Sequence, residues 1–411
     1  MYKVVKTPSL LDPFLDEFAD LFTKPSHSSF CHLVTAIAVC AKSKTISNLC
    51  ETISNSNVKK KSRSSYNWFF DSSKWDENKV AQQNANLFFK FMGLNIGDTL
   101  LLVVDDTYNK KKGKHTEGVG RFYDHNEGHI WGNNFVTSVL QIKDSFIPHK
   151  AKMYIKKDDA NEDFRTKLQI AFEDIIKPLE IPEGVQLMIV FDSWWFSSGL
   201  INDCRELGYH VTCRIKSDKL VVPDDRLALQ VQNYVKKFST HDYKITRISV
   251  RGKEKTYFTI GCIIKLDKIG EVKLIISTRM NNNTNNNPTY YICTNTDIST
   301  AGILSIYEDR WDIETVHREA NQKLGFKDYQ LRHKKAIERF ILLVFTVWNC
   351  LLLLELGKPR RTNRLKTIGE MVLDIRSDVI MDSIKYILER LNVSIPDRNL
   401  LYVLRSMGIK T

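Results

Sequence analysis

The chain has 411 residues, of which 43% are hydrophobic and 10% aromatic, so it can bury a sizeable core and is not globally disordered. Its formal net charge of +12 favours a polyanionic partner, because lysines and arginines that neutralise phosphates release counterions. The eight cysteines are scattered and form no CxxC pair, which argues against a zinc site or a disulfide framework and suits a reducing cytosol. This length predicts two or three domains.

Residues 1–96 are predicted to be helical, because apolar residues recur at spacings of three and four. Acidic residues stand where a signal peptide would need an apolar core, so we expect no export. The segment 57–70, NVKKKSRSSYNWFF, places basic residues next to aromatic ones. It is either a solvated loop or a contact with DNA phosphates, in a DNA-binding domain, through Lys59, Lys60, Lys61 and Arg63.

Strands that alternate with helices are predicted from residue 97 to residue 242. The run 99–107, TLLLVVDDT, and the run 185–196, VQLMIVFDSWWF, are apolar strands that end in acids. Further strands are expected within 122–144 and 151–155. Strands that are apolar throughout indicate a mainly parallel sheet covered on both faces.

The remaining chain divides into three predicted regions. Residues 243–295 alternate polar and apolar side chains, which indicates a β-rich insertion. Residues 296–335 return to the core with a helix, and residues 336–411 are mostly helical. Within the last region, the apolar run 340–356 contains Asn349 and is predicted to be a buried helix rather than a membrane span.

Two of the predicted strands end in candidate site residues, Asp105 (with Asp106) and Asp192. Ligand sites of open α/β sheets form at strand ends, although an acid there can also cap a helix. Neighbouring carboxylates repel each other unless cations lie between them. Their hard oxygens suit Mg²⁺ or Mn²⁺.

A third acid comes from the segment 303–330, which we predict to be one amphipathic helix. At 100° per residue, its apolar face collects Ile306, Ile313, Val316, Ala320 and Leu324, and its solvated face collects Glu308, Asp312, Glu319 and Lys323. Between these faces runs a stripe of Tyr307, Arg310, Glu314 and Arg318. An ion pair between Arg310 and Glu314 could explain part of this stripe, but it does not explain why Tyr307 lies on the same stripe.

These residues resemble the signature of DDE transposases of the insertion-sequence-four superfamily, Tyr-x₂-Arg-x₃-Glu-x₆-Lys. Tyr307, Arg310 and Glu314 match it, and the regions VVDDTYNKKKGKHTEGVGRFY and IVFDSWWFSS resemble the family's first and second acid regions. The first of these favours Asp105, two residues before Thr107, over Asp106. Asn321 stands where the family has Lys, which puts one contact with the DNA end in doubt.

The resemblance implies an α/β fold with an RNase H-like core, a β-rich insertion and helical regions at both ends. It implies that Asp105, Asp192 and Glu314 hold two Mg²⁺ (or Mn²⁺) ions about 4 Å apart and cut DNA by in-line displacement. Tyr307 and Arg310 would hold a phosphate, and Trp194 or Trp195 would stack on a flipped base. Further candidate DNA contacts are Arg318, Lys112 and Lys114.

The implied partner is double-stranded DNA, both transposon ends and target, bound by a homodimer near a prokaryotic nucleoid and away from membranes. Two other functions stay open at this point. One is an RNase H-like nuclease that hydrolyses DNA without strand transfer. The other is a non-catalytic DNA-binding descendant, against which the presence of all three acids argues.

Overall fold

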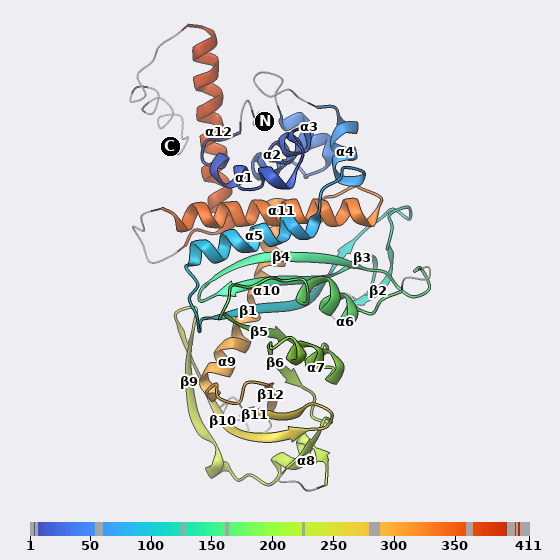
Figure 1. Ribbon diagram of the computed structural model, residues 1–411, viewed down its shortest axis with the longest axis vertical. Coiled ribbons are helices and arrows are strands. Elements are labelled where there is room, and N and C mark those ends of the chain that lie inside the picture. The colour runs from blue at the N-terminus through green and yellow to red at the C-terminus, as the bar shows by residue number, and fades with distance from the viewer. Residues whose placement is uncertain are drawn as a thin grey trace.

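The computed structural model describes residues 4, 7–53, 61–124, 128–160, 164–223, 227–278, 288–358, 365–392, 399 and 402. Helices from the two ends of the chain pack on one side of a large mixed sheet, and further strands extend the sheet away from them (Figure 1). The α/β class, the RNase H-like arrangement and the flanking helical regions agree with the expected fold.

The N-terminal region is helical. Thr45, Ser62 and Asp76 cap three of its helices by accepting hydrogen bonds from backbone amides in the first turn. The helices are α1 (Asp12–Asp16), η1 (Ala19–Leu21), α2 (Lys24–Val39), α3 (Ile46–Thr52), α4 (Arg63–Asp71) and α5 (Glu77–Met92).

A single sheet runs through the molecule in the order β2-β3-β1-β5-β6-β12-β11-β10-β7-β8, with β4 paired to β3 and β9 to β10. Its strands up to β6 are β1 (Thr99–Lys110), β2 (Gly120–Asp124), β3 (Gly128–Ile142), β4 (Ser145–Tyr154), β5 (Gln186–Phe191) and β6 (His210–Ile215). Among the strands that the structure describes, the β1–β5 and β5–β6 pairs are parallel and the other pairs are antiparallel. The prediction of a mainly parallel sheet is therefore wrong: β3 is antiparallel, yet buried along most of its length.

The β-rich region is joined to the core sheet rather than separate from it. Antiparallel pairing of β12 with β6 makes the connection. The strands of this part are β7 (Leu220–Val222), β8 (Leu229–Gln230), β9 (Lys244–Val250), β10 (Lys253–Leu266), β11 (Gly270–Thr278) and β12 (Thr289–Cys293).

The remaining helices cover the sheet and link it to the N-terminal region. They are α6 (Lys167–Ile170), the π-helical η2 (Ala171–Ile176), α7 (Ser198–Glu206), α8 (Val231–Val235), η3 (Thr240–Asp242), α9 (Thr300–Asp309), α10 (Asp312–Leu324), α11 (Lys334–Leu356) and α12 (Ile368–Arg390). Helix α11 is long and apolar enough to cross a membrane, but 89% of its most apolar window is buried inside the protein. It packs against β4 and α5 on one side and against α2 and α4 on the other, as Figure 1 shows, which agrees with the predicted buried helix.

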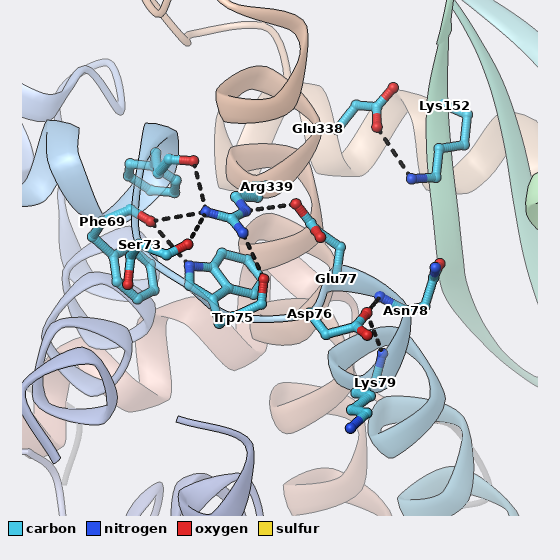
Figure 2. A network of polar contacts seen from close by, with 11 residues as sticks. Phe69, Ser73, Trp75, Asp76, Glu77, Asn78, Lys79, Lys152, Glu338 and Arg339 are labelled. Atoms are coloured by element: carbon cyan, nitrogen blue, oxygen red, sulfur yellow. Dashed lines mark hydrogen bonds and ion pairs between the residues drawn. The ribbon is translucent and has the colours of Figure 1, made fainter. Parts of the chain in front are cut away.

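Arg339 is a buried charge on α11, and its partners show how the two ends of the chain are joined (Figure 2). Its Nε donates to Glu77 at 2.6 Å. The two other guanidinium nitrogens donate to backbone carbonyls of the segment between α4 and α5, including those of Ser73 (2.8 Å) and Trp75 (2.5 Å). The guanidinium also lies over the Trp75 ring, 4.2 Å from its centroid. These partners satisfy the hydrogen-bonding groups of the buried guanidinium, which would otherwise be costly to place in a core.

Candidate active site

Asp105 and Asp192 lie on two neighbouring parallel strands. Asp105 is inside β1, which continues to Lys110, whereas Asp192 directly follows the last residue of β5, so the prediction that the first strand ends at its acids is wrong. In the register of β1 and β5, Val103 pairs with Val190, and each acid stands two residues further along its strand. Because side chains alternate along a strand, both acids project from the same face as that pair. Asp192 follows β5 directly, where its Oδ1 accepts a hydrogen bond from the Trp194 amide at 2.8 Å. The structure therefore brings the first two predicted acids together.

Glu314 lies in the first turn of α10, after a break in the predicted helix. Residues 310 and 311 form a turn between α9 and α10, so one continuous helix from 303 was a wrong prediction. Most of the predicted apolar face is buried: Ile313, Val316, Ala320 and Leu324 in α10 are buried, while Ile306 in α9 is half-buried.

The predicted solvated face, in contrast, is partly covered. Asp312 is buried and forms an ion pair with Arg251 of the β9–β10 turn. Glu308 accepts hydrogen bonds at 2.5 Å from Lys255 and from Tyr257 of β10. The β-rich region thus holds both helices of the Glu314 segment in place.

Arg310 connects the carboxylates. Its Nη1 lies 3.1 Å from Oδ2 of Asp105, and its Nη2 lies 3.5 Å from Oε1 of Glu314. Burial lowers the pKa of Arg310, but Tyr307, Asp105, Asp192 and Glu314 outweigh that effect and raise it above its usual value. All three predicted acids therefore act on one guanidinium.

Asp105 has a strongly perturbed acidity. Burial raises the pKa of its carboxyl to about 7, against the lowering effect of Arg310, and the charges of Asp106 and Asp192 add to the increase. Carboxyls perturbed by burial together with specific charged neighbours are common at functional sites. The carbonyl oxygen of Asp105 also accepts a hydrogen bond from Thr137 at 3.0 Å.

Asp106 belongs to different surroundings. Its Oδ2 lies 2.5 Å from Nζ of Lys167 and accepts a hydrogen bond from Asn134 at 2.8 Å. Adjacent residues of a strand point to opposite faces, so Asp106 faces away from Asp192. This placement favours Asp105 as the site residue.

The three acids offer the hard oxygen ligands that Mg²⁺ and Mn²⁺ prefer, and two of them come from the neighbouring strands β1 and β5. In the part of the chain that the structure describes, no three acidic, histidine or cysteine side chains lie close enough together to hold one ion. The carboxylate oxygens fit a divalent cation. In this structure, however, the carboxylates of Asp105 and Glu314 contact the Arg310 guanidinium.

Among the predicted DNA contacts, the aromatic residues differ in exposure. Trp194 is 54% exposed, whereas Trp195 is 1% exposed, so the prediction that Trp195 stacks on a base is wrong for this structure. The Tyr307 ring is buried, packs on Tyr291 with ring centroids 4.8 Å apart, and lies 5.7 Å from the Arg310 guanidinium. Tyr307 thus packs beside the Arg310 side chain.

The basic candidates also divide into two groups. Lys112, Lys114, Arg63 and Arg318 are exposed, as a phosphate contact requires. Lys61 instead binds α2, donating to Ser29 at 2.7 Å and to the Pro25 carbonyl. Lys59 and Lys60 lie outside the described residues. Asn321, in place of the family lysine, is half-buried on α10.

Two residues beside the acids were not predicted from the sequence. Lys167, which binds Asp106, lies 5.1 Å from the centroid of the Trp194 ring. His317 on α10 lies 2.8 Å from the Thr137 hydroxyl, and burial lowers the pKa of this histidine to about 4. His317 stands one turn after Glu314 and ties α10 to β3. The sequence signal for His317 was its place three residues after Glu314, whereas nothing near Lys167 marked it.

Comparisons with known proteins identify the family of this chain. Residues 17–237 match the family described as "DDE superfamily endonuclease", and residues 132–361 match the family described as "Archaeal putative transposase ISC1217". A curated relative from Microchaete diplosiphon, "Probable transposase for insertion sequence element IS701", is 24% identical over 284 residues. That match covers 66% of this chain and 70% of the relative.

Proposed function

The chain belongs to the DDE superfamily of endonucleases and transposases, and from this we propose that it cuts DNA at transposon ends and joins them to target DNA. The observation that carries the proposal is the placement of Asp105 and Asp192 two residues beyond the last paired residues of the neighbouring strands β1 and β5, with Glu314 linked to Asp105 through Arg310. A set of carboxylates gathered from two strands and a helix is suited to phosphoryl transfer.

Asp105, Asp192 and Glu314 would hold two divalent cations, Mg²⁺ or Mn²⁺. When bound, such ions activate a water or a DNA 3′-hydroxyl and stabilise the leaving oxygen of an in-line displacement. The protein's own part is to fix the carboxylates. β1 and β5 set the spacing of the two aspartates, while the His317–Thr137 contact and the ion pair of Asp312 with Arg251 hold α10.

DNA would be held by basic side chains around this site. Arg310 offers a forked donor for a phosphate, and the exposed Lys112, Lys114 and Arg318 add positive charge. Trp194 presents an exposed ring for stacking on an unpaired base, as a hairpin intermediate of a cut-and-paste route requires.

Residues 1–96 would form a further DNA-binding domain, and two copies of the protein would act together on two transposon ends in the nucleoid. We place the chain within the insertion-sequence-four superfamily on the Tyr307–Arg310–Glu314 spacing.

The decisive experiment supplies a pre-cut transposon end with a free 3′-hydroxyl, a target plasmid and Mg²⁺, and maps the products on a denaturing gel. Joined products are expected from the wild type. Glu314→Gln and Asp192→Asn should abolish them while the protein still binds DNA. Nicking without joining would instead identify a nuclease, and Mg²⁺-dependent cleavage by Glu314→Gln would remove Glu314 from the site.

A further inference from the structure

Arg310 occupies the place between carboxylates where a metal site needs a cation. Its side chain is 14% exposed, and it reaches Asp105 with one nitrogen and Glu314 with another. It stands at the break between α9 and α10, outside the regular part of either helix. The carboxylates are therefore neutralised in part by a residue of the chain itself.

A guanidinium and divalent cations compete for such a position. Both are attracted by the same oxygens, and like charges that share a partly buried site repel each other strongly. A divalent cation carries twice the charge of a guanidinium and binds hard oxygen ligands directly. Ions that bind Asp105 and Glu314 must therefore displace Arg310, whose planar fork then suits a phosphate.

We infer that Arg310 exchanges partners: it pairs with Asp105 and Glu314 in the metal-free protein and moves to a DNA phosphate when divalent cations bind the carboxylates. This inference rests on the proposed function and adds that metal binding and DNA binding are thermodynamically coupled. Because the same side chain opposes metal binding and favours DNA binding, each ligand raises the affinity for the other. Such coupling is reciprocal, so it can be measured from either side.

The first measurement is a calorimetric titration of the full-length, metal-free protein with Mn²⁺ in the absence of DNA. Arg310→Ala and Arg310→Gln remove the competing charge and should bind Mn²⁺ about tenfold more tightly than the wild type. Two variants are compared because Gln keeps much of the side-chain volume, and thermal unfolding identifies any variant that does not fold. The matched control is Lys323→Ala, which removes an exposed positive charge from α10, the helix that follows Arg310, and should change the affinity less than about twofold.

Three results would overturn the exchange. The first is wild-type Mn²⁺ affinity in both Arg310 variants. The second is an equal gain in Lys323→Ala, which would mean that net charge alone sets the affinity. The third is a titration that Asp192→Asn leaves unchanged, which would show that the metal site itself is misassigned and would remove the proposed function as well.

The second measurement tests the DNA side of the coupling. Ca²⁺ is used because it binds oxygen ligands and serves to separate binding from cleavage. Ca²⁺ should increase the affinity of the wild type for a short mixed-sequence duplex, and this increase should be about tenfold smaller in Arg310→Ala. Equal increases in the two proteins would show that Arg310 is not released to DNA.

Discussion

The ammonium group of Lys167 lies 2.5 Å from Oδ2 of Asp106, so the acid next to Asp105 already has a cation of its own. Both side chains are largely buried, and the rings of Tyr108, Tyr154 and Trp194 surround the ammonium at 5.1 to 5.5 Å. The two adjacent aspartates of β1 therefore have separate roles. Asp105 faces Arg310 and the second strand end, while Asp106 fixes α6 against the sheet.

Asp106→Asn should accordingly affect stability more than catalysis. It leaves Lys167 without its carboxylate, which should lower the free energy of unfolding by about 1–3 kcal/mol. DNA cleavage should fall less than about tenfold, whereas Asp105→Asn should reduce it more than about a hundredfold. Urea denaturation and single-turnover cleavage of the two variants separate these effects, and the reverse pattern would mean that Asp106 is the site residue.

The adjacent tryptophans should respond in opposite ways to substitution. Trp195→Ala empties a buried position and should cost about 3–5 kcal/mol of stability. Trp194→Ala, at an exposed position, should leave the melting temperature nearly unchanged but weaken stacking on an unpaired base by about 1–3 kcal/mol. Fluorescence titration with a duplex that contains a flipped 2-aminopurine measures this loss, and equal affinity of Trp194→Ala and wild type would exclude the stacking role.

The stability of the metal-free protein should depend on pH through Asp309. Burial raises the pKa of Asp309 to about 7, Asp312 adds to the increase, and Arg251 opposes it. Since the pKa in the unfolded chain is near 3.8, the native state holds the proton more tightly, and stability falls as the pH rises from about 4 to about 7. Asp309→Asn should reduce this fall. Urea denaturation at several pH values measures the free energy of unfolding of the wild type and of Asp309→Asn. If this free energy depended on pH in the same way in both proteins, Asp309 would not be the residue responsible.

Arg339 should be among the most sensitive positions for folding. Arg339→Ala leaves Glu77 and several buried carbonyls without a donor, which should cost about 3–5 kcal/mol. Lys335→Ala on the same helix is the control, because Lys335 is exposed, and it should change stability by less than about 0.5 kcal/mol. Chemical denaturation monitored by circular dichroism compares the two, and similar losses would mean that the Arg339 contacts contribute little.

The sequence predicted those features that depend on the local order of apolar and polar residues. Apolar runs followed by acids located the two neighbouring strands β1 and β5, although β1 continues past its acids to Lys110, and the 3.6-residue period located the buried face of α10. The polar Asn349 within an apolar run indicated a core helix, and α11 is one.

Tertiary neighbours determined what the sequence could not predict. The break after Asp309 follows no glycine or proline, and Asp312 is buried only because Arg251 arrives from a distant turn. Apolar runs indicated parallel strands, yet β3 is buried along most of its length while it pairs antiparallel with its three partners β1, β2 and β4. Lys167 meets Asp106 across 61 residues, a distance over which residue spacing carries no signal.

The position of α11 has a consequence for how the protein is synthesised. The helices α2, α4 and α5 leave the ribosome first, but the apolar faces that they present are covered by α11, which is translated more than two hundred residues later. During that interval, the nascent chain exposes a surface that attracts chaperones and promotes aggregation. Chains interrupted before α11 should therefore be removed by proteolysis rather than persist as stable fragments.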